Sequence, residues 1–276
     1  MFGNTCYRAY SYLKSKDSEK KVVLNDVYCD FLNITDCTLT ETADRVAITA
    51  CEQNYVHIER EISILKSCNH VNIVKHYQSW LEQATPCSEL DKIYIQMEYC
   101  EHNLDHVSAI IQSVYKRKTN EMISPVAYFI MLTLIDGILA GIEYLHSKRI
   151  KHRNINMNNI LLKGSVVKVC DFGLAKVIES SSEIHSNVGK VSYKAPEVQS
   201  GGNYNTLADV YSLGAMFIQF MNVDINKQDV HPELKDLLAR MIAGVANKRP
   251  TCSELLIMFG KSPVIYDLDQ VRADHH

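Results

Sequence analysis

The segment from His152 to Gly173, HRNINMNNILLKGSVVKVCDFG, decides the fold of this chain. It holds two largely apolar runs, Ile160–Leu162 and Val166–Val169, in which Lys168 is the one polar residue and whose aliphatic side chains are typical of short strands. Asn159 stands before the first run, and Asp171 follows the second run twelve residues later. The segment therefore predicts two short strands that lie between two polar loops.

This layout resembles the catalytic loop and the Asp-Phe-Gly turn of eukaryotic protein kinases. Further motifs of that family follow in the expected order, namely Ala195-Pro196-Glu197, Asp209 and Arg249. The resemblance implies an α+β fold with a small β-rich N-lobe, which carries one helix, and a larger helical C-lobe. It also implies that Asp209 braces the catalytic loop and that Arg249 pairs with Glu197. We place the N-lobe at about 26–100 and the C-lobe at about 101–260, between an N-terminal extension, 1–25, and a C-terminal tail, 261–276.

A closer resemblance rests on two segments of the N-lobe. Residues His70–Glu82 read HVNIVKHYQSWLE and residues Ile95–Cys100 read IQMEYC. Both are similar to the kinases that phosphorylate the α subunit of translation initiation factor 2. The spacing of twelve residues between Thr49 and Glu61 fits the same kinases.

The N-lobe departs from the family in the groups that bind phosphate. No glycine occurs between Gly3 and Gly137, so the glycine-rich loop that closes over the phosphates is missing. Thr49 stands where the family has a lysine, although Glu61, the partner of that lysine, is present. Arg45 shares a strand face with Thr49 and is either a substitute partner for Glu61 or an exposed strand-edge arginine. If Glu61 finds no partner, burying it is costly, and we then expect its helix to swing outward or to leave Glu61 in water.

The catalytic loop lacks its two reactive groups. Asn154 stands where the family has the aspartate that accepts the substrate proton, and Asn156 replaces the lysine that contacts the transferred phosphate. An amide cannot take up a proton at neutral pH, and a general base contributes about 10²- to 10⁴-fold to the rate. We therefore expect little phosphotransfer.

The resemblance also assigns the positions that would meet ATP and magnesium. Met97 is the gatekeeper, and the residues from Glu98 to Cys100 form the hinge that meets adenine. Asn159 and Asp171 keep the oxygen atoms that hold Mg²⁺ in the family. Since the glycine-rich loop and the lysine are missing, we expect weak binding of ATP and magnesium or none, and we assign no other cofactor.

Three functions are compatible with this pattern. The first is a pseudokinase, an inactive binding or regulatory module that acts on a protein partner, either a kinase or a translation factor. The second is a divergent active serine/threonine kinase that uses Arg45 and an unusual base. The third is a nucleotide-binding switch that uses Asn159 and Asp171. The segment from Asn222 to Pro232 is short where the initiation-factor kinases build a docking helix, so we do not expect docking of the factor in that mode.

Composition bears on three further properties of the protein, namely nucleic-acid binding, membrane association and cellular location. A net charge of -3 and a pI near 6.4 give no basic footprint for nucleic acid or for an anionic membrane surface. Nine dispersed cysteines predict reduced thiols and hence a cytoplasmic or nuclear protein. The apolar run Val126–Leu145 is interrupted by Asp136 and Glu143, which favours a buried helix over a membrane span.

Overall fold

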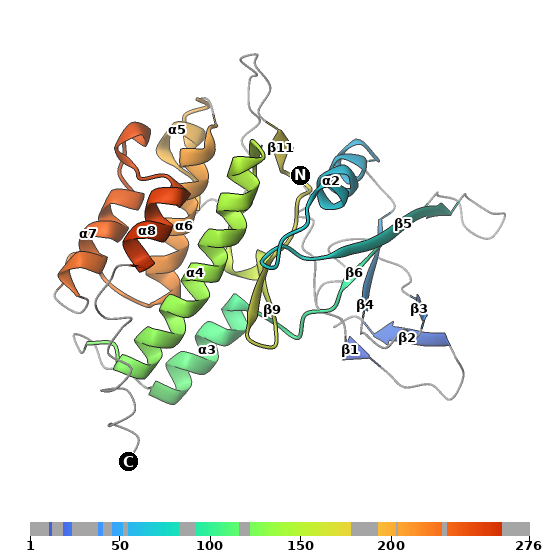
Figure 1. The fold of residues 1–276 in the computed structure, drawn as a ribbon, viewed down its shortest axis with the longest axis horizontal. Helices are drawn as coiled ribbons and strands as arrows, with labels where there is room; N and C mark the ends of the chain where they lie inside the picture. Colours follow the sequence, from blue (N-terminus) through green and yellow to red (C-terminus); the bar gives the residue numbers. More distant parts are fainter. Residues whose placement is uncertain are drawn as a thin grey trace.

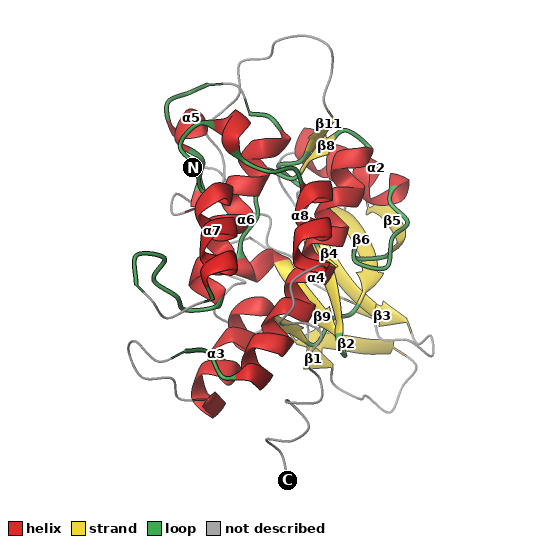
Figure 2. Cartoon of the chain, turned by 60° about the vertical axis from the view of Figure 1, so that its left-hand side comes forward, coloured by secondary structure: helices red, strands yellow, loops and turns green. Residues whose placement is uncertain are grey.

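The structure is a computed structural model that describes residues 11–12, 19–23, 38–40, 46–51, 55–82, 92–115, 122–177, 193–202, 204–227 and 231–260. In Figure 1 the strands from the first part of the chain lie on one side, and most helices of the second part lie on the other. Figure 2 shows the same separation of strands and helices from a second direction. This arrangement confirms the predicted α+β fold with a small β-rich lobe and a larger helical lobe.

The described part of the N-lobe contains two antiparallel sheets. The first sheet has the order β1-β2-β3 and consists of β1 (Ser11–Tyr12), β2 (Glu19–Val23) and β3 (Thr38–Thr40). The second sheet has the order β4-β6-β5 and consists of β4 (Val46–Cys51), β5 (His76–Glu82) and β6 (Lys92–Glu98). Strands β1 and β2 lie within residues 1–25, the stretch that the sequence assigns to an extension.

Helix α2 (Tyr55–Ser67) belongs to the N-lobe, and one face of it is buried. On this face Ile58 and Leu65 are buried, whereas Ile62 is only half-buried. Glu61 is also buried, because residues three and four apart share a face of a helix and Glu61 lies between Ile58 and Leu65. The fold therefore turns this carboxylate inward.

The C-lobe contains helices and several short strands. Its helices are α3 (Leu104–Tyr115), α4 (Pro125–Ser147), α5 (Pro196–Gln199), α6 (Thr206–Phe220), α7 (Pro232–Met241) and α8 (Cys252–Gly260), with the 3-10 turns η1 (Met157–Asn159) and η3 (Ala246–Lys248). Its strands are β7 (His102–Asn103), β8 (Ile150–Lys151), β9 (Ile160–Lys163), β10 (Val166–Val169) and β11 (Lys176–Val177). The predicted strand pair is present as β9 and β10, which pair antiparallel.

Helix α4 forms the centre of the C-lobe. It begins with Ser124 as the N-cap, whose hydroxyl accepts a hydrogen bond from the N–H of Ala127 at 3.2 Å, and with Pro125 in the first turn, a pair typical of helix starts. By length and composition its segment Ala127–Ser147 could cross a membrane, but 56% of that window is buried inside the protein. The helix therefore serves as a core element, as the sequence predicts.

Glycines on α4 let the connection between α2 and β5 lie against it. A Cβ atom at Gly141 would lie 2.8 Å from the carbonyl oxygen of Asn72 and 2.9 Å from a methyl group of Val169. The Asn72 carbonyl accepts a hydrogen bond from the N–H of Val169 at 2.8 Å, and Val74 donates to the Val169 carbonyl at 3.0 Å. This close packing ties the N-lobe to β10, the strand that leads into Asp171.

The connection between α6 and α7 is short. Among the described residues of this connection, 221–227 and 231, no helix occurs. Gly214 on α6 permits α7 to approach, because a Cβ atom there would lie 2.7 Å from the Cβ of Met241.

Candidate active site

Asp209 holds the catalytic loop in place from α6, as the resemblance predicts. Its Oδ2 accepts the N–H of His152 at 2.9 Å, and its Oδ1 accepts the N–H of Arg153 at 2.9 Å. The Tyr204 hydroxyl donates to Oδ1 at 2.6 Å, and Nε2 of His146 lies 2.9 Å from Oδ2. Burial raises the pKa of Asp209, but the hydrogen bonds and charges of these partners outweigh it, so the net shift is downward. The ionised carboxylate of Asp209 therefore fixes the backbone position of the loop at His152 and Arg153.

The imidazole of His152 connects the loop to the strand that follows it. Its Nε2 donates to the carbonyl oxygen of Cys170 at 3.0 Å, and its Nδ1 accepts the N–H of Asn154 at 3.2 Å. Complete burial lowers the pKa of His152, which favours the neutral ring that these two bonds require. His152 therefore fixes the backbone on both sides of the site.

Asn154 and Asp171 are in direct contact. The Nδ2 of Asn154 donates to Oδ2 of Asp171 at 2.6 Å, and the Nδ2 of Asn159 donates to the same oxygen at 3.0 Å. The backbone N–H of Gly173 reaches Oδ1 at 3.4 Å. Burial raises the pKa of Asp171, and the hydrogen bonds from Gly173, Asn154 and Asn159 act in the opposite direction because they stabilise the ionised form. The Asp171 carboxylate is thus surrounded by N–H donors.

Asn156, at the position where the resemblance predicts a lysine, stabilises the loop itself. Its Nδ2 donates to the carbonyl oxygen of Asn154 at 3.0 Å and to the side-chain Oδ1 of Asn154 at 3.3 Å. Its own Oδ1 accepts the N–H of Asn158 at 3.0 Å, which caps the turn η1. The structure therefore brings together the predicted residues Asn154, Asn156, Asn159 and Asp171.

Glu61 finds a partner in the Asp-Phe-Gly turn, so the condition for an outward helix is not met. Its Oε1 accepts the backbone N–H of Phe172 at 3.3 Å, and Glu61 is only 1% exposed. The Phe172 ring is fully buried and lies 5.4 Å from the His152 ring, measured between centroids. Sequence reasoning considered only side chains as partners of Glu61, and it missed this backbone donor.

The side chain of Glu98 binds groups outside the hinge. Its Oε1 accepts the backbone N–H of Lys75 at 2.7 Å and lies 2.8 Å from Nζ of Lys168. A longer contact of 3.6 Å joins Oε2 to Nζ of Lys163. Both lysines come from the β9–β10 hairpin, so an ion pair that the sequence did not indicate links the hinge to the C-lobe.

The remaining predicted positions are only partly described. Met97 is 2% exposed and Cys100 is 1% exposed, and burial together with the charge of Glu98 raises the pKa of the Cys100 thiol to about 12. The backbone of Thr49 pairs with Ile95 in the β4–β6 ladder. The side chain of Thr49 and the whole of Arg45 lie outside the described residues.

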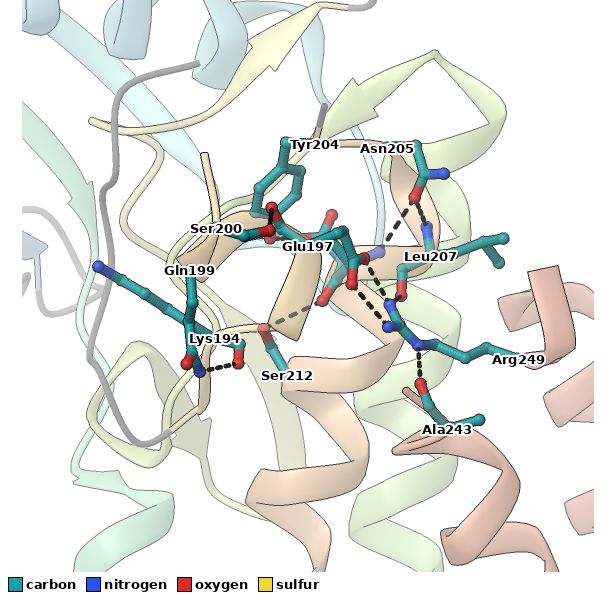
Figure 3. Close-up of polar contacts among 12 residues, drawn as sticks. Lys194, Glu197, Gln199, Ser200, Tyr204, Asn205, Leu207, Ser212, Ala243 and Arg249 are labelled. Atoms are coloured by element: carbon teal, nitrogen blue, oxygen red, sulfur yellow. Dashed lines mark hydrogen bonds and ion pairs between the residues drawn. The ribbon is translucent and has the colours of Figure 1, made fainter. Parts of the chain in front are cut away.

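Glu197 and Arg249 form the predicted ion pair (Figure 3). The Nη1 of Arg249 lies 2.7 Å from Oε1 of Glu197 and Nη2 lies 2.8 Å from Oε2, a two-pronged geometry. Arg249 also donates to the carbonyl oxygens of Ala243 at 2.8 Å and Leu207 at 2.9 Å. The pair therefore joins α5 to the end of the C-lobe.

The polar residues do not fit a magnesium ion in this arrangement. Mg²⁺ requires oxygen lone pairs in near-octahedral geometry, whereas the amides of Asn154 and Asn159 direct N–H groups at Asp171. Across the part of the chain that the structure describes, no group of three or more His, Cys, Asp or Glu residues could hold a metal ion. The site therefore presents a carboxylate that is already hydrogen-bonded.

Comparison with known proteins identifies the family. The protein kinase domain family matches residues 33–226. The chain is 33% identical over 189 residues to the serine/threonine-protein kinase dst2 of Dictyostelium discoideum, which covers 66% of this chain and 15% of that protein. It is 34% identical over 176 residues to the serine/threonine-protein kinase pakH of the same organism, which covers 63% of this chain and 31% of that protein.

A third relative is the mitogen-activated protein kinase kinase kinase 1a of Physcomitrium patens, 31% identical over 222 residues, with 72% of this chain and 27% of that protein covered. The chain thus spans less than a third of the length of these three relatives. Their names do not mention an initiation factor, so the resemblance to the kinases of initiation factor 2 stays a prediction. The match over residues 33–226, together with the two-lobed fold, shows that this chain belongs to the protein kinase domain family.

Proposed function

We propose that this chain is a pseudokinase, a kinase fold that acts by binding a protein partner and does not transfer phosphate. The observation that carries the proposal is the hydrogen bond of 2.6 Å from the Asn154 amide to Asp171. A catalytic base must accept a proton from the substrate hydroxyl, but Asn154 has no basic group and uses its N–H within the protein. Asn156 likewise caps a turn and carries no positive charge for a phosphate.

The second candidate is an active serine/threonine kinase, which three structural observations and the relatives favour. Glu61 points inward, Phe172 is buried, and Asp209 braces the loop, as a productive kinase needs. The relatives described above are also named as kinases. An active kinase must bind ATP, whereas a pseudokinase need not. We propose that this chain binds ATP weakly or not at all.

The partner that we propose is a kinase or a translation factor. Of these two partners, a kinase is the better supported. The residues that the structure describes between α6 and α7 form no helix, so this chain offers no docking helix there for the translation factor. We place the protein in the cytoplasm or the nucleus, supported by nine dispersed cysteines with no C-x-x-C pair, a pattern typical of reduced thiols.

Isotope transfer from labelled ATP to a mixture of serine and threonine peptides tests the proposal. The purified chain is compared with an Asp171→Ala variant, in magnesium and in manganese, with a relative of known activity as the positive control. We expect equal, background-level signals from the chain and from the variant. A signal that the chain gives and Asp171→Ala abolishes would establish the second candidate.

A further inference from the structure

The geometry points to Asn154 as a built-in replacement for the divalent cation at Asp171, so that this chain orders its Asp-Phe-Gly turn without a metal. This inference rests on the proposed function and deepens it, because it explains what the altered loop does. In an active kinase the aspartate of this turn is a ligand of a magnesium ion. Here Oδ2 of Asp171 accepts two amide N–H groups, at 2.6 Å from Asn154 and 3.0 Å from Asn159.

The orientation of the Asn154 amide is set by Asn156. An asparagine side chain has one acceptor end and one donor end. The acceptor Oδ1 of Asn154 is occupied by Nδ2 of Asn156 at 3.3 Å, which leaves the donor Nδ2 to face Asp171. Asn156 is thus a positioning residue for the contact, at the position where active kinases carry a lysine.

The contact is also enclosed. Asn154 is 3% exposed, Asn156 is 6% exposed, and Asn159 and Asp171 are 0% exposed. The carbonyl oxygen of Asn154 accepts Nδ2 of Asn159 at 2.8 Å, so the loop cannot withdraw Asn154 without breaking further bonds. A buried carboxylate needs such partners, because leaving it without them costs free energy. The asparagines supply them in place of a cation.

Replacing the Asn154 amide by a carboxylate should make the site depend on a metal ion. In Asn154→Asp, two carboxylates would share the space of one hydrogen bond, with oxygen atoms as close as the present 2.6 Å. Like charges at this distance repel strongly in a buried site, and a divalent cation relieves the repulsion. We therefore expect the variant to lose stability in chelator and to regain it with magnesium or manganese.

The test measures the melting temperature in EDTA, in millimolar magnesium and in millimolar manganese, together with Mn²⁺ binding by electron paramagnetic resonance. The wild type should show no Mn²⁺ binding that depends on Asp171, and its melting temperature should not respond to either metal. Asn154→Asp should melt at least about 6 °C lower in EDTA, since it breaks a buried polar contact, and should recover with metal. The matched control is Asn205→Asp, because Asn205 is an exposed N-cap where aspartate serves equally well.

A double variant keeps the proposal testable if Asn154→Asp does not fold. Asn154→Asp with Asp171→Asn exchanges the amide and the carboxylate, and we expect it to fold and to melt at the same temperature with and without metal. Mn²⁺ bound by the wild type and lost in Asp171→Asn would overturn the inference. So would a melting temperature of Asn154→Asp that equals the wild type in EDTA, or a double variant that requires metal. Because none of these measurements reports phosphotransfer, metal bound without transfer overturns this inference alone, and transfer without bound metal overturns the proposed function alone.

Discussion

The backbone N–H of Phe172 donates to the carboxylate of Glu61 at 3.3 Å, across a separation of 111 residues in the chain. This contact places α2 inward although the strand position that supplies the usual lysine is occupied by Thr49. The chain therefore keeps an inward α2 although the sequence has Thr49 at the position where the resemblance to kinases predicts a lysine. Within the protein, this hydrogen bond connects α2 to the Asp-Phe-Gly turn.

The first prediction concerns this contact. Glu61→Gln keeps an oxygen acceptor for the Phe172 N–H, whereas Glu61→Ala removes it and leaves a buried donor. We expect Glu61→Ala to lower the free energy of unfolding by about 1–3 kcal/mol and Glu61→Gln to lower it by less than about 1 kcal/mol. Urea unfolding of both variants checks the difference. Equal losses in the two variants would show that the acceptor oxygen is not what matters.

The second prediction concerns the ion pair between Glu98 and Lys168. Their side chains are 4% and 11% exposed, so Lys168→Met leaves a buried carboxylate with fewer partners. We expect a loss of about 3 kcal/mol in the free energy of unfolding. Lys163→Met is the matched control, because Lys163 is 39% exposed and 3.6 Å away, and its loss should stay below about 1 kcal/mol.

A double-mutant cycle isolates the pair. Lys168→Met leaves the Glu98 carboxylate without the ammonium group beside it, and adding Glu98→Gln removes that negative charge. The double variant should therefore lose less free energy of unfolding than the sum of the two single losses. Strict additivity would mean that the two side chains do not stabilise each other.

Local patterns allowed much of the fold to be predicted from sequence. Ser124-Pro125 marked the start of α4, and the branched residues around Gly164 marked the β9–β10 pair. The Glu197–Arg249 pair followed from the resemblance to kinases. These features depend on residues that are close in the chain or on motifs that a family shares.

The polar contacts of the site could not be predicted in the same way. The Glu98–Lys168 pair joins residues 70 positions apart, and no periodicity in the sequence relates them. The sequence showed that Asn154 cannot act as a base, but not that its amide would turn toward Asp171. That orientation depends on Asn156, whose side chain occupies the other end of the amide. Such information resides in three-dimensional packing.

The third prediction tests the close approach of the lobes at α4. Gly141→Ala places a Cβ atom 2.8 Å from the Asn72 carbonyl oxygen, so the backbone of one element must move. We expect a loss of about 1–3 kcal/mol in the free energy of unfolding. Gly244→Ala is the control, since its Cβ atom would meet nothing within 4 Å and it should be neutral or slightly stabilising. A harmless Gly141→Ala would contradict the packing described for Asn72.

The fourth prediction is a pH dependence at Glu197. Burial raises the pKa of this carboxyl group, but the hydrogen bonds and charge of Arg249 outweigh burial and hold the pKa below its ordinary value of 4.5. A carboxyl group whose pKa is lower in the folded state stabilises the fold fully above its unfolded pKa, and this contribution is lost as pH falls through the folded pKa. The stability advantage of the wild type over Glu197→Gln should therefore be constant from neutral pH to about pH 5 and shrink below it.

Urea unfolding of both proteins across this pH range measures that difference. Arg249→Lys provides a second comparison, because lysine keeps the charge but cannot form both hydrogen bonds. A difference between wild type and Glu197→Gln that does not change with pH would mean that the ion pair does not set the pKa of Glu197.

The most direct test of the central claim is ADP formation, since it requires no knowledge of the acceptor protein. The purified chain and its Asp171→Ala variant are incubated with ATP in magnesium and in manganese, and ADP is quantified over hours. If Asn154 and Asn156 have replaced the catalytic groups, both proteins form ADP at the same background rate. ADP formed faster by the wild type than by Asp171→Ala, in either metal, would contradict the account and identify the chain as an active kinase.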